Sequence, residues 1–256
     1  MTAQHPGLHV LHDGPDSAPT MVLIHGTAAS SRTWDALVPH LSTSHHVVRV
    51  DLPGCGQSPK SIATSYALAE QARRLAATLD QIGVTNATVV GHSSGGAVAT
   101  ALLEQRRDLV HSVALINTGP HMGAFVGPDS NIGPVTPEGL SDDQLRLFLS
   151  SAFGPGFAVP QAVIDEARNV DFEVFAATSH AIQAYLDERA LPDRLASLQT
   201  PVLVIFGAED QRWRPESAED YRAVPGAVIE MLPGVGHSPI IEAPERTATL
   251  LQAFTS

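Results

Sequence analysis

Short apolar runs rich in β-branched residues alternate with longer amphipathic segments, and this alternation constrains the fold more than any other feature. Most of the runs are continuously apolar, which is typical of strands that helices cover on both faces. The pattern predicts an α/β fold with a mostly parallel central sheet flanked by helices. The predicted strands are Thr20–His25, His46–Asp51, Ala87–Gly91, Val113–Asn117, Pro201–Phe206 and Val228–Leu232, with Leu8–His12 as an additional strand in front.

Apolar residues at helical spacing predict helices between these strands. The clearest case is Ser65–Ile82, where Leu68, Leu75 and Leu79 fall on one stripe and Gly83 ends the pattern. Three further segments have the same character: Ser31–Leu41, Ser94–Gln105 and Ala243–Phe254.

Residues 119–198 interrupt the alternation. The first 21 of them contain nine Gly or Pro residues, which predicts a loop, and helical patterns follow at Ser141–Phe153, Pro160–Asn169 and Phe172–Arg189. Six of the eight phenylalanines of the chain lie in this insertion. We interpret residues 119–198 as a helical cap, and residues 1–118 and 199–256 as the core that carries it.

A glycine-rich turn follows one predicted strand and leads directly into a predicted helix. Its sequence is Gly91-His-Ser-Ser-Gly-Gly96. At such a strand–turn–helix junction, a G-x-S-x-G segment holds the serine in a tight, strained turn and presents its hydroxyl above the sheet. Ser93 is therefore the predicted nucleophile, and a buried turn without chemistry is the alternative.

A serine nucleophile needs a base, and the base needs an acid that orients it. Of the twelve histidines, His237 is the predicted base because it lies in a glycine-flanked loop between the last strand and the last helix. Asp210 directly follows the carboxyl end of another strand and is the predicted acid, ahead of its neighbour Glu209. Asn117, at the end of the preceding strand, has no carboxylate to offer.

Two backbone N–H groups are predicted to face the nucleophile. Gly26 allows a sharp turn after the strand that ends at His25, which would direct the Thr27 N–H toward the same point as the Ser94 N–H. Two such donors form the oxyanion hole that a tetrahedral intermediate requires. His25 is expected to support this loop rather than to react.

Together these segments resemble the α/β-hydrolase superfamily, in its cap-bearing group without cofactors. The resemblance runs from residue 20 to the end of the chain, with the nucleophile, acid and base in the family order, and it is specific for fold and triad but not for substrate. It implies an α/β-hydrolase fold with a helical cap inserted after the sixth strand. The matching segments are His25-Gly26, Asp51-Leu-Pro-Gly-Cys-Gly-Gln-Ser58, Gly91-His-Ser-Ser-Gly95, Gly207-Ala-Glu-Asp210 and Gly236-His237.

The resemblance also implies a mechanism. Ser93 attacks an acyl carbon while His237 accepts its proton, Asp210 holds the imidazole tautomer, and the Thr27 and Ser94 N–H groups bind the oxyanion. Relatives that open epoxides or remove halides have an aspartate at the position of Ser93, so those activities are disfavoured. No cofactor and no metal is implied.

The chain departs from the family pattern at two places. The family commonly begins with a two-strand hairpin, whereas here only one predicted strand precedes Thr20. Pro215 follows the acid one residue later than in the family, which makes Trp213 a candidate pocket wall. The other candidate pocket residues are His25, Phe125 and Phe153, although the phenylalanines of the insertion can equally form a small core of the cap.

Composition excludes several classes of protein. With a net charge of −12 and scattered arginines, the chain lacks the basic clusters that nucleic acids or anionic membranes require. The single cysteine, Cys55, permits neither an internal disulfide nor a cysteine-based zinc site. The chain shows no signal-peptide pattern and no apolar run of membrane-spanning length. We therefore expect a cytoplasmic monomer or homodimer that acts on a small molecule, and the net charge favours neutral substrates over long anionic ones.

Three functions are compatible with these residues. The first is hydrolysis of a carboxylic ester, thioester or lactone of a small-to-medium apolar substrate. The second is C–C bond hydrolysis or perhydrolysis by the same triad; a C–C hydrolase needs a cationic pocket for the carboxylate of its substrate, for which Arg212 and Arg214 are candidates. The third is a ligand receptor on a hydrolase scaffold with little turnover.

Overall fold

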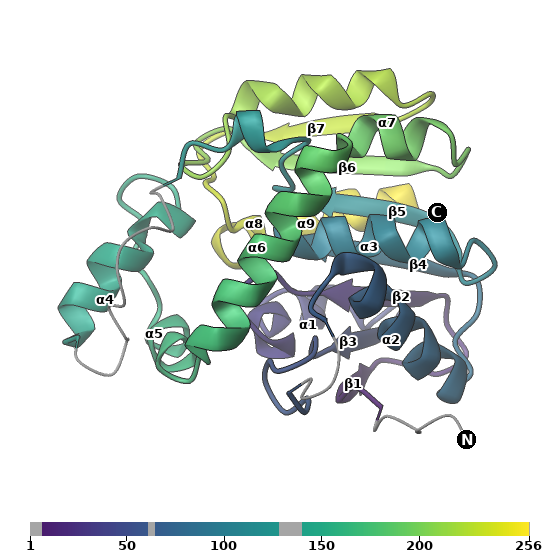
Figure 1. Ribbon diagram of the computed structural model, residues 1–256, viewed down its shortest axis with the longest axis horizontal. Coiled ribbons are helices and arrows are strands. Elements are labelled where there is room, and N and C mark those ends of the chain that lie inside the picture. Colours follow the sequence, from purple (N-terminus) through teal and green to yellow (C-terminus); the bar gives the residue numbers. More distant parts are fainter. Residues whose placement is uncertain (1–6, 61–64, 128–139, 256) are drawn as a thin grey trace.

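A seven-stranded sheet forms the centre of the computed structural model, which describes residues 7–60, 65–127 and 140–255 (Figure 1). The strand order is β1-β3-β2-β4-β5-β6-β7, and β1 pairs antiparallel with β3 while every other pair is parallel. This confirms the predicted α/β fold with a mostly parallel sheet. The strands are β1 (Val10–Asp13), β2 (Thr20–Ile24), β3 (His46–Val50), β4 (Ala87–His92), β5 (Val110–Ile116), β6 (Val202–Gly207) and β7 (Val228–Leu232).

Helices cover both faces of the sheet. One face carries α2 (Leu68–Gln81), α3 (Ser94–Gln105) and α7 (Leu191–Ala196), and the other carries α1 (Val38–Leu41), α8 (Pro239–Glu242) and α9 (Pro244–Phe254). Short 3-10 helices lie at Ser31–Trp34, Met122–Ala124, Ser150–Ala152 and Pro215–Ala223. None of the helices in the described residues combines the length and apolar character that a membrane crossing requires.

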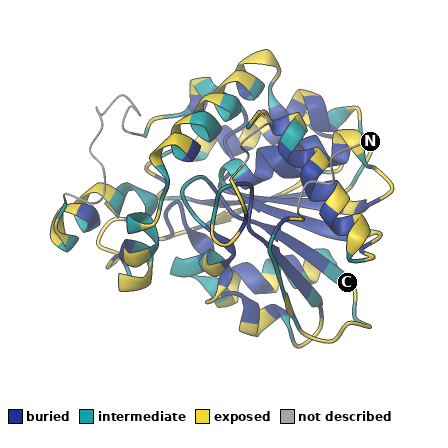
Figure 2. Ribbon diagram, turned by 60° about the horizontal axis from the view of Figure 1, so that its bottom comes forward, coloured by how far each residue is buried: buried dark blue, intermediate teal, exposed yellow. Residues whose placement is uncertain are grey.

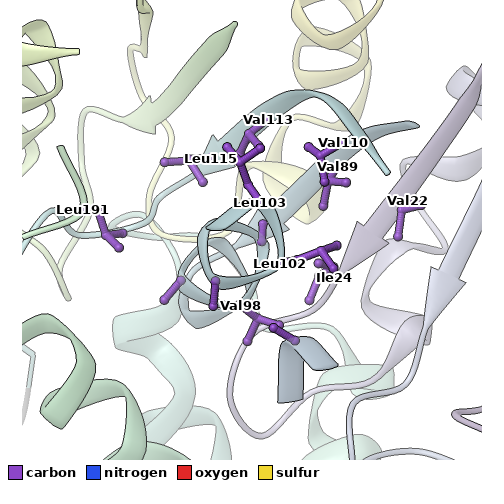
Figure 3. Close-up of a cluster of buried hydrophobic side chains, with 14 of the residues drawn as sticks. Val22, Ile24, Val89, Val98, Leu102, Leu103, Val110, Val113, Leu115 and Leu191 are labelled. Carbon is purple, nitrogen blue, oxygen red and sulfur yellow. The ribbon is translucent and has the colours of Figure 1, made fainter. Parts of the chain in front are cut away.

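Strands β2 to β6 contribute alternate side chains to two apolar cores. In β2, Val22 and Ile24 belong to the core under α2 and α3, whereas Met21 and Leu23 belong to the core under α1 and α9. Figure 3 shows the first of these cores, where β2, β4 and β5 pack against α3. The central strands are buried along nearly their whole length, as Figure 2 shows, which explains why their sequences are continuously apolar.

The helical insertion lies between β5 and β6. It contains α4 (Asp142–Leu149), α5 (Gln161–Arg168) and α6 (Phe172–Glu188), of which α4 and α5 extend beyond the edge of the sheet (Figure 1). The expectation that it follows the sixth strand is wrong for the described residues: it follows the fifth, because β1 is the single strand that precedes β2 there. Part of the predicted loop, residues 128–139, lies outside the described residues.

Candidate active site

Ser93 sits at the turn between β4 and α3 in a backbone conformation that is unfavourable for a residue with a side chain. Its φ is 53° and its ψ is −123°. Such strain costs about 1–3 kcal/mol and persists only where the surroundings impose it. Here the two flanking glycines permit the turn: a Cβ on Gly91 would lie 2.4 Å from the Gly95 backbone, and one on Gly95 would lie 2.3 Å from the Ile24 carbonyl oxygen.

A continuous chain of hydrogen bonds joins Ser93 to His237 and Asp210. His237 Nε2 is 3.0 Å from Ser93 Oγ, and His237 Nδ1 is 2.9 Å from Asp210 Oδ2. Because an ionised carboxylate only accepts hydrogen bonds, the Nδ1–H donates to Asp210 and Nε2 is free to accept the serine proton. The arrangement can therefore deprotonate the Ser93 hydroxyl as an acyl carbon is attacked.

Asp210, rather than its neighbour Glu209, faces the histidine. Asp210 is buried while Glu209 is exposed, which decides between the two predicted acids. Burial by itself would raise the pKa of Asp210, but the neighbouring His237 and hydrogen bonds from Asn117 and from the Arg212 backbone lower that pKa below its usual range. Asp210 is therefore ionised at neutral pH.

Asn117 is a site residue whose part the sequence did not reveal. Its Nδ2 donates to Asp210 Oδ2 at 2.7 Å and to the Gly236 carbonyl at 3.2 Å, while its Oδ1 accepts from the Gly207 N–H at 3.1 Å. It also adopts a φ of 45° at the end of β5. The Asn117 side chain thereby joins the segment that carries Asp210 to the loop that carries His237.

Glu242 is a second such residue, and its carboxylate holds the loop on both sides of His237. Oε2 accepts from the Gly236 N–H at 3.0 Å, and Oε1 accepts from the Ser238 N–H at 3.0 Å. Oε2 also accepts from the N–H of Gly154, at 2.8 Å, which ties the helical insertion to the same loop. The position of His237 thus depends on a carboxylate five residues later.

His92 supports His237 from beneath. Its Nε2–H donates to the His237 carbonyl at 2.9 Å, and the two rings lie 5.2 Å apart. Burial, helped by the adjacent His237, lowers the pKa of His92 to about 3. His92 is therefore neutral at neutral pH and acts as a fixed hydrogen-bond donor.

The loop after β2 lies against Ser93, as predicted. A Cβ on Gly26 would be 3.1 Å from the Ser93 Cβ, and the Thr27 hydroxyl donates to Ser94 Oγ at 2.9 Å. Within the described part of the chain, neither the Thr27 nor the Ser94 backbone N–H has an acceptor. Both donors remain available to a bound oxygen atom.

His25 holds this loop rather than lining a pocket. The Leu52 N–H donates to His25 Nε2 at 3.0 Å, so the proton is on Nδ1, which donates to the Gly26 carbonyl at 2.8 Å. The side chain is fully buried, and burial lowers its pKa. Both ring nitrogens are occupied by backbone groups, which corrects the expectation of His25 as a pocket residue and agrees with its expected supporting role.

The three aromatic pocket candidates pack mainly against protein. Phe153 is 1% exposed, stacks on Phe157 and belongs to the small core of the insertion. Trp213 is 7% exposed and packs against Gly119 and Phe125. Phe125 is half-buried beside it. These placements do not support Phe153 and Trp213 as pocket walls, because both side chains are needed to fill cores.

Alternative nucleophiles and metal sites are not favoured within the described residues. Burial and the nearby Asp51 and Glu166 carboxylates raise the pKa of the Cys55 thiol to about 12, so it stays protonated and unreactive. No group of three or more His, Cys, Asp or Glu side chains there is arranged to hold a metal ion.

Comparison with known proteins identifies the family. The model of the alpha/beta hydrolase family matches residues 21–250. The chain is 27% identical to monoacylglycerol lipase abhd6-B of Xenopus laevis over 94% of its own length and 77% of that protein. It is 30% identical to a Pseudomonas syringae pv. syringae (strain B728a) protein with the provisional name carbamate hydrolase RutD, over 93% of this chain and 94% of that one.

A crystal structure of a membrane phospholipase A superposes with a TM-score of 0.76 at 28% identity, covering 97% of this chain and 82% of that chain. The fold, the strained turn at Ser93 and the match of the family model to residues 21–250 all point to the same family. The chain belongs to the α/β-hydrolase family.

Proposed function

We propose that the protein is a serine hydrolase that cleaves a carboxylic ester, thioester or lactone of a small molecule through an acyl-enzyme on Ser93. The observation that carries this proposal is the hydrogen-bonded series from Ser93 through His237 to Asp210, with donor–acceptor distances of 3.0 and 2.9 Å. The relatives support it, since lipases and a phospholipase are among the proteins most similar to this chain.

The reaction proceeds in two halves. Ser93 Oγ attacks the acyl carbon and its proton moves to His237 Nε2, while the carbonyl oxygen becomes an oxyanion that the Thr27 and Ser94 N–H groups bind. The C–O or C–S bond then breaks, and His237 gives that proton to the departing alkoxide or thiolate, which becomes an alcohol or thiol while the acyl group stays on Ser93. In the second half His237 takes a proton from water, the resulting nucleophile attacks the acyl carbon, and the acid departs as Ser93 regains its proton.

Asp210 and His92 contribute through His237. The ionised Asp210 stabilises the imidazolium that forms when His237 takes the proton. Its four hydrogen bonds keep it oriented, and the His92 bond fixes the backbone from which the imidazole projects. Removing one oxyanion donor typically costs about 10²–10³ in rate, so a large part of the acceleration would come from the Thr27 and Ser94 N–H groups.

The test is turnover of p-nitrophenyl esters of graded acyl length. We expect wild-type protein to release p-nitrophenol and Ser93→Ala to lose at least about 1000-fold in kcat. Ser44→Ala, which changes a hydroxyl remote from Ser93, is the matched control and should retain full activity. A Ser93→Ala variant with most of the wild-type activity would refute the proposal, and so would wild-type protein that turns over no member of the panel.

A further inference from the structure

One side-chain hydrogen bond joins the two residues whose backbone N–H groups are the proposed oxyanion donors. Thr27 Oγ1 donates to Ser94 Oγ at 2.9 Å, although the two residues are 67 positions apart in the sequence. Among the described residues, this is the only hydrogen bond between the loop at residues 26–30 and the serine turn at residues 92–96. The two halves of the proposed oxyanion hole are therefore linked through a pair of hydroxyl groups.

The turn that carries Thr27 is not closed by backbone hydrogen bonds of its own. Within the part of the chain that the structure describes, residues 27–29 make no backbone–backbone hydrogen bond. The next residue, Ala28, has a φ of 59°, which is unfavourable for a residue with a side chain. Such a conformation persists only where the surroundings impose it. The bond from Thr27 to Ser94 is one of the contacts that can hold this strained turn in place.

The turn that carries Ser94 is held firmly by the sheet. The Ser93 N–H donates to the Ile116 carbonyl at 2.8 Å, and the Ser93 carbonyl accepts from the Thr118 hydroxyl at 2.9 Å. A Cβ on Gly95 would lie only 2.3 Å from the Ile24 carbonyl oxygen, so this turn packs directly on the neighbouring strand. Ser94 is therefore a fixed point to which the loop of the other donor is attached.

The Thr27 side chain can pass this restraint on to its own backbone. Threonine is branched at Cβ, so its χ1 has few accessible values. Its hydroxyl has one proton, and the hydrogen bond to Ser94 uses that proton. A stiff side chain whose donor is fixed on Ser94 restricts where the Thr27 backbone, with its N–H group, can lie. Both residues are half-buried, which limits the access of water that would compete for the hydroxyl groups.

We propose that the hydroxyl pair of Thr27 and Ser94 positions the oxyanion hole by holding the Thr27 N–H at a fixed separation from the Ser94 N–H. The two side chains are positioning groups, because they act on the oxyanion through the backbone donors. This inference rests on the proposed function for the reaction. Oxyanion donors stabilise a transition state only where they are preorganised, and a misplacement of about 1 Å can cost about 100-fold in rate. The loss belongs to the transition state, so it falls on kcat rather than on KM.

The kinetic test removes one hydroxyl while nearly keeping the shape of the side chain. Thr27→Val should lower kcat for the best p-nitrophenyl ester by about tenfold and change KM by less than about twofold. Thr27→Ser keeps the hydroxyl and should recover most of the lost kcat. Thr249→Val removes an exposed threonine hydroxyl on α9 and is the matched control, which should keep wild-type kinetics. Equal kcat values for Thr27→Val and wild type, or a loss that Thr27→Ser does not recover, would overturn the proposal.

A double-mutant cycle tests whether the two hydroxyls act as a pair. Ser94→Ala should lower kcat about as much as Thr27→Val, because each variant breaks the same hydrogen bond. The double variant Thr27→Val/Ser94→Ala should then be at most about twofold slower than the slower single variant, since one bond can be lost only once. If the losses multiply instead, to about 100-fold in the double variant, the hydroxyls act separately and the proposed pair is refuted.

Binding of an alkyl trifluoromethyl ketone, measured by calorimetry, keeps the inference separate from the proposed function. Ser93 Oγ adds to the ketone carbon, its proton passes to His237, and the ketone oxygen becomes the anion that the oxyanion hole binds. The Kd should rise by about tenfold in Thr27→Val and stay near the wild-type value in Thr27→Ser.

The outcomes of this measurement separate the two claims. If wild-type protein hydrolyses no ester yet Thr27→Val weakens ketone binding as expected, the proposed function fails and the positioning role stands. If wild-type protein hydrolyses esters but Thr27→Val binds the ketone as tightly as wild type, the positioning role alone fails. Wild-type protein that neither hydrolyses an ester nor binds the ketone contradicts both claims.

Discussion

Replacing the Glu242 carboxylate by an amide tests how the His237 loop is held. Glu242 accepts three backbone N–H groups, from Gly154, Gly236 and Ser238, at 2.8, 3.0 and 3.0 Å. Glutamine has the same shape but only one oxygen. Whichever way the amide of Glu242→Gln turns, its NH2 faces at least one of these N–H groups, so at least one donor loses its acceptor.

The magnitude follows from these contacts. A hydrogen bond to a charged acceptor contributes about 1.5–3 kcal/mol and a neutral one about 0.5–1.5 kcal/mol, and an unsatisfied buried donor costs about 1–3 kcal/mol. Two weakened bonds and one lost bond would sum to more, but Glu242 is half-buried and water can replace part of the loss. We expect the free energy of unfolding to fall by about 2–3 kcal/mol. We also expect kcat to fall by about 10- to 100-fold, because the loop that carries His237 is held less firmly.

The assay is urea unfolding of Glu242→Gln together with ester turnover. Glu245→Gln is the matched control, because Glu245 is exposed on the neighbouring helix α9 and the same charge is removed. The control should unfold within about 0.5 kcal/mol of wild type and keep its kcat. If Glu242→Gln and Glu245→Gln behave alike in both measurements, the carboxylate does not hold the loop and the reasoning fails.

Two further predictions concern the surroundings of His237. The pKa of His92 is about 3 in the folded chain against an ordinary value of 6.5, so between these pH values the unfolded chain binds a proton that the folded chain does not. The free energy of unfolding of the wild-type protein should therefore decline as pH falls through this window. His92→Phe should make that decline less steep, by up to about 1.4 kcal/mol per pH unit, when both proteins are unfolded in urea at pH 7, 6 and 5. The same pH dependence in both proteins would contradict this prediction. A Cβ on Gly236 would lie 2.0 Å from the Gly154 nitrogen, whereas one on Gly234 meets nothing within 4 Å. Gly236→Ala should thus lower the free energy of unfolding by at least about 3 kcal/mol. Gly234→Ala should lower it by only about 1 kcal/mol, because of the positive φ of Gly234. Equal losses of stability would argue against close packing of the insertion on this loop.

The sheet and its central residues were predictable because they obey local rules. Continuous apolar runs indicated the strands, and the predicted helix Ser94–Gln105 matches α3 at both ends. The residues predicted as nucleophile, acid and base all follow the carboxyl ends of parallel strands. The carboxyl ends of parallel strands meet at one edge of the sheet. The positions of Ser93, Asp210 and His237 directly after predicted strands therefore led us to expect that they lie close together, and hydrogen bonds join them in the structure.

Asn117 and His92 were not predictable as supporting residues, because their partners are remote in sequence. Asn117 lies 93 residues from Asp210, and His92 lies 145 residues from His237. Asn117 did carry one signal, a polar residue at the end of an apolar strand. Glu242 gave none, since a glutamate in a short helical turn is common on any surface.

Phe153 and Trp213 do not fit the predicted role of pocket walls, for a different reason. Aromatic residues in an insertion can either form its core or face a ligand, and the sequence pattern is the same in both cases. Phe153 belongs to the core of the insertion, because it packs with Leu145, Val159 and Ile164. The short helix α7 (Leu191–Ala196) was also missed, because six residues with a proline in the first turn leave too little periodicity to detect.

Covalent labelling of Ser93 tests the central claim most directly. Wild-type protein treated with a fluorophosphonate should gain one adduct, located on Ser93 by peptide mapping. His237→Ala should label at least about 100-fold more slowly, because the serine loses the base that lies 3.0 Å from its hydroxyl. An adduct on another residue, or equal labelling of wild type and Ser93→Ala, would contradict the account.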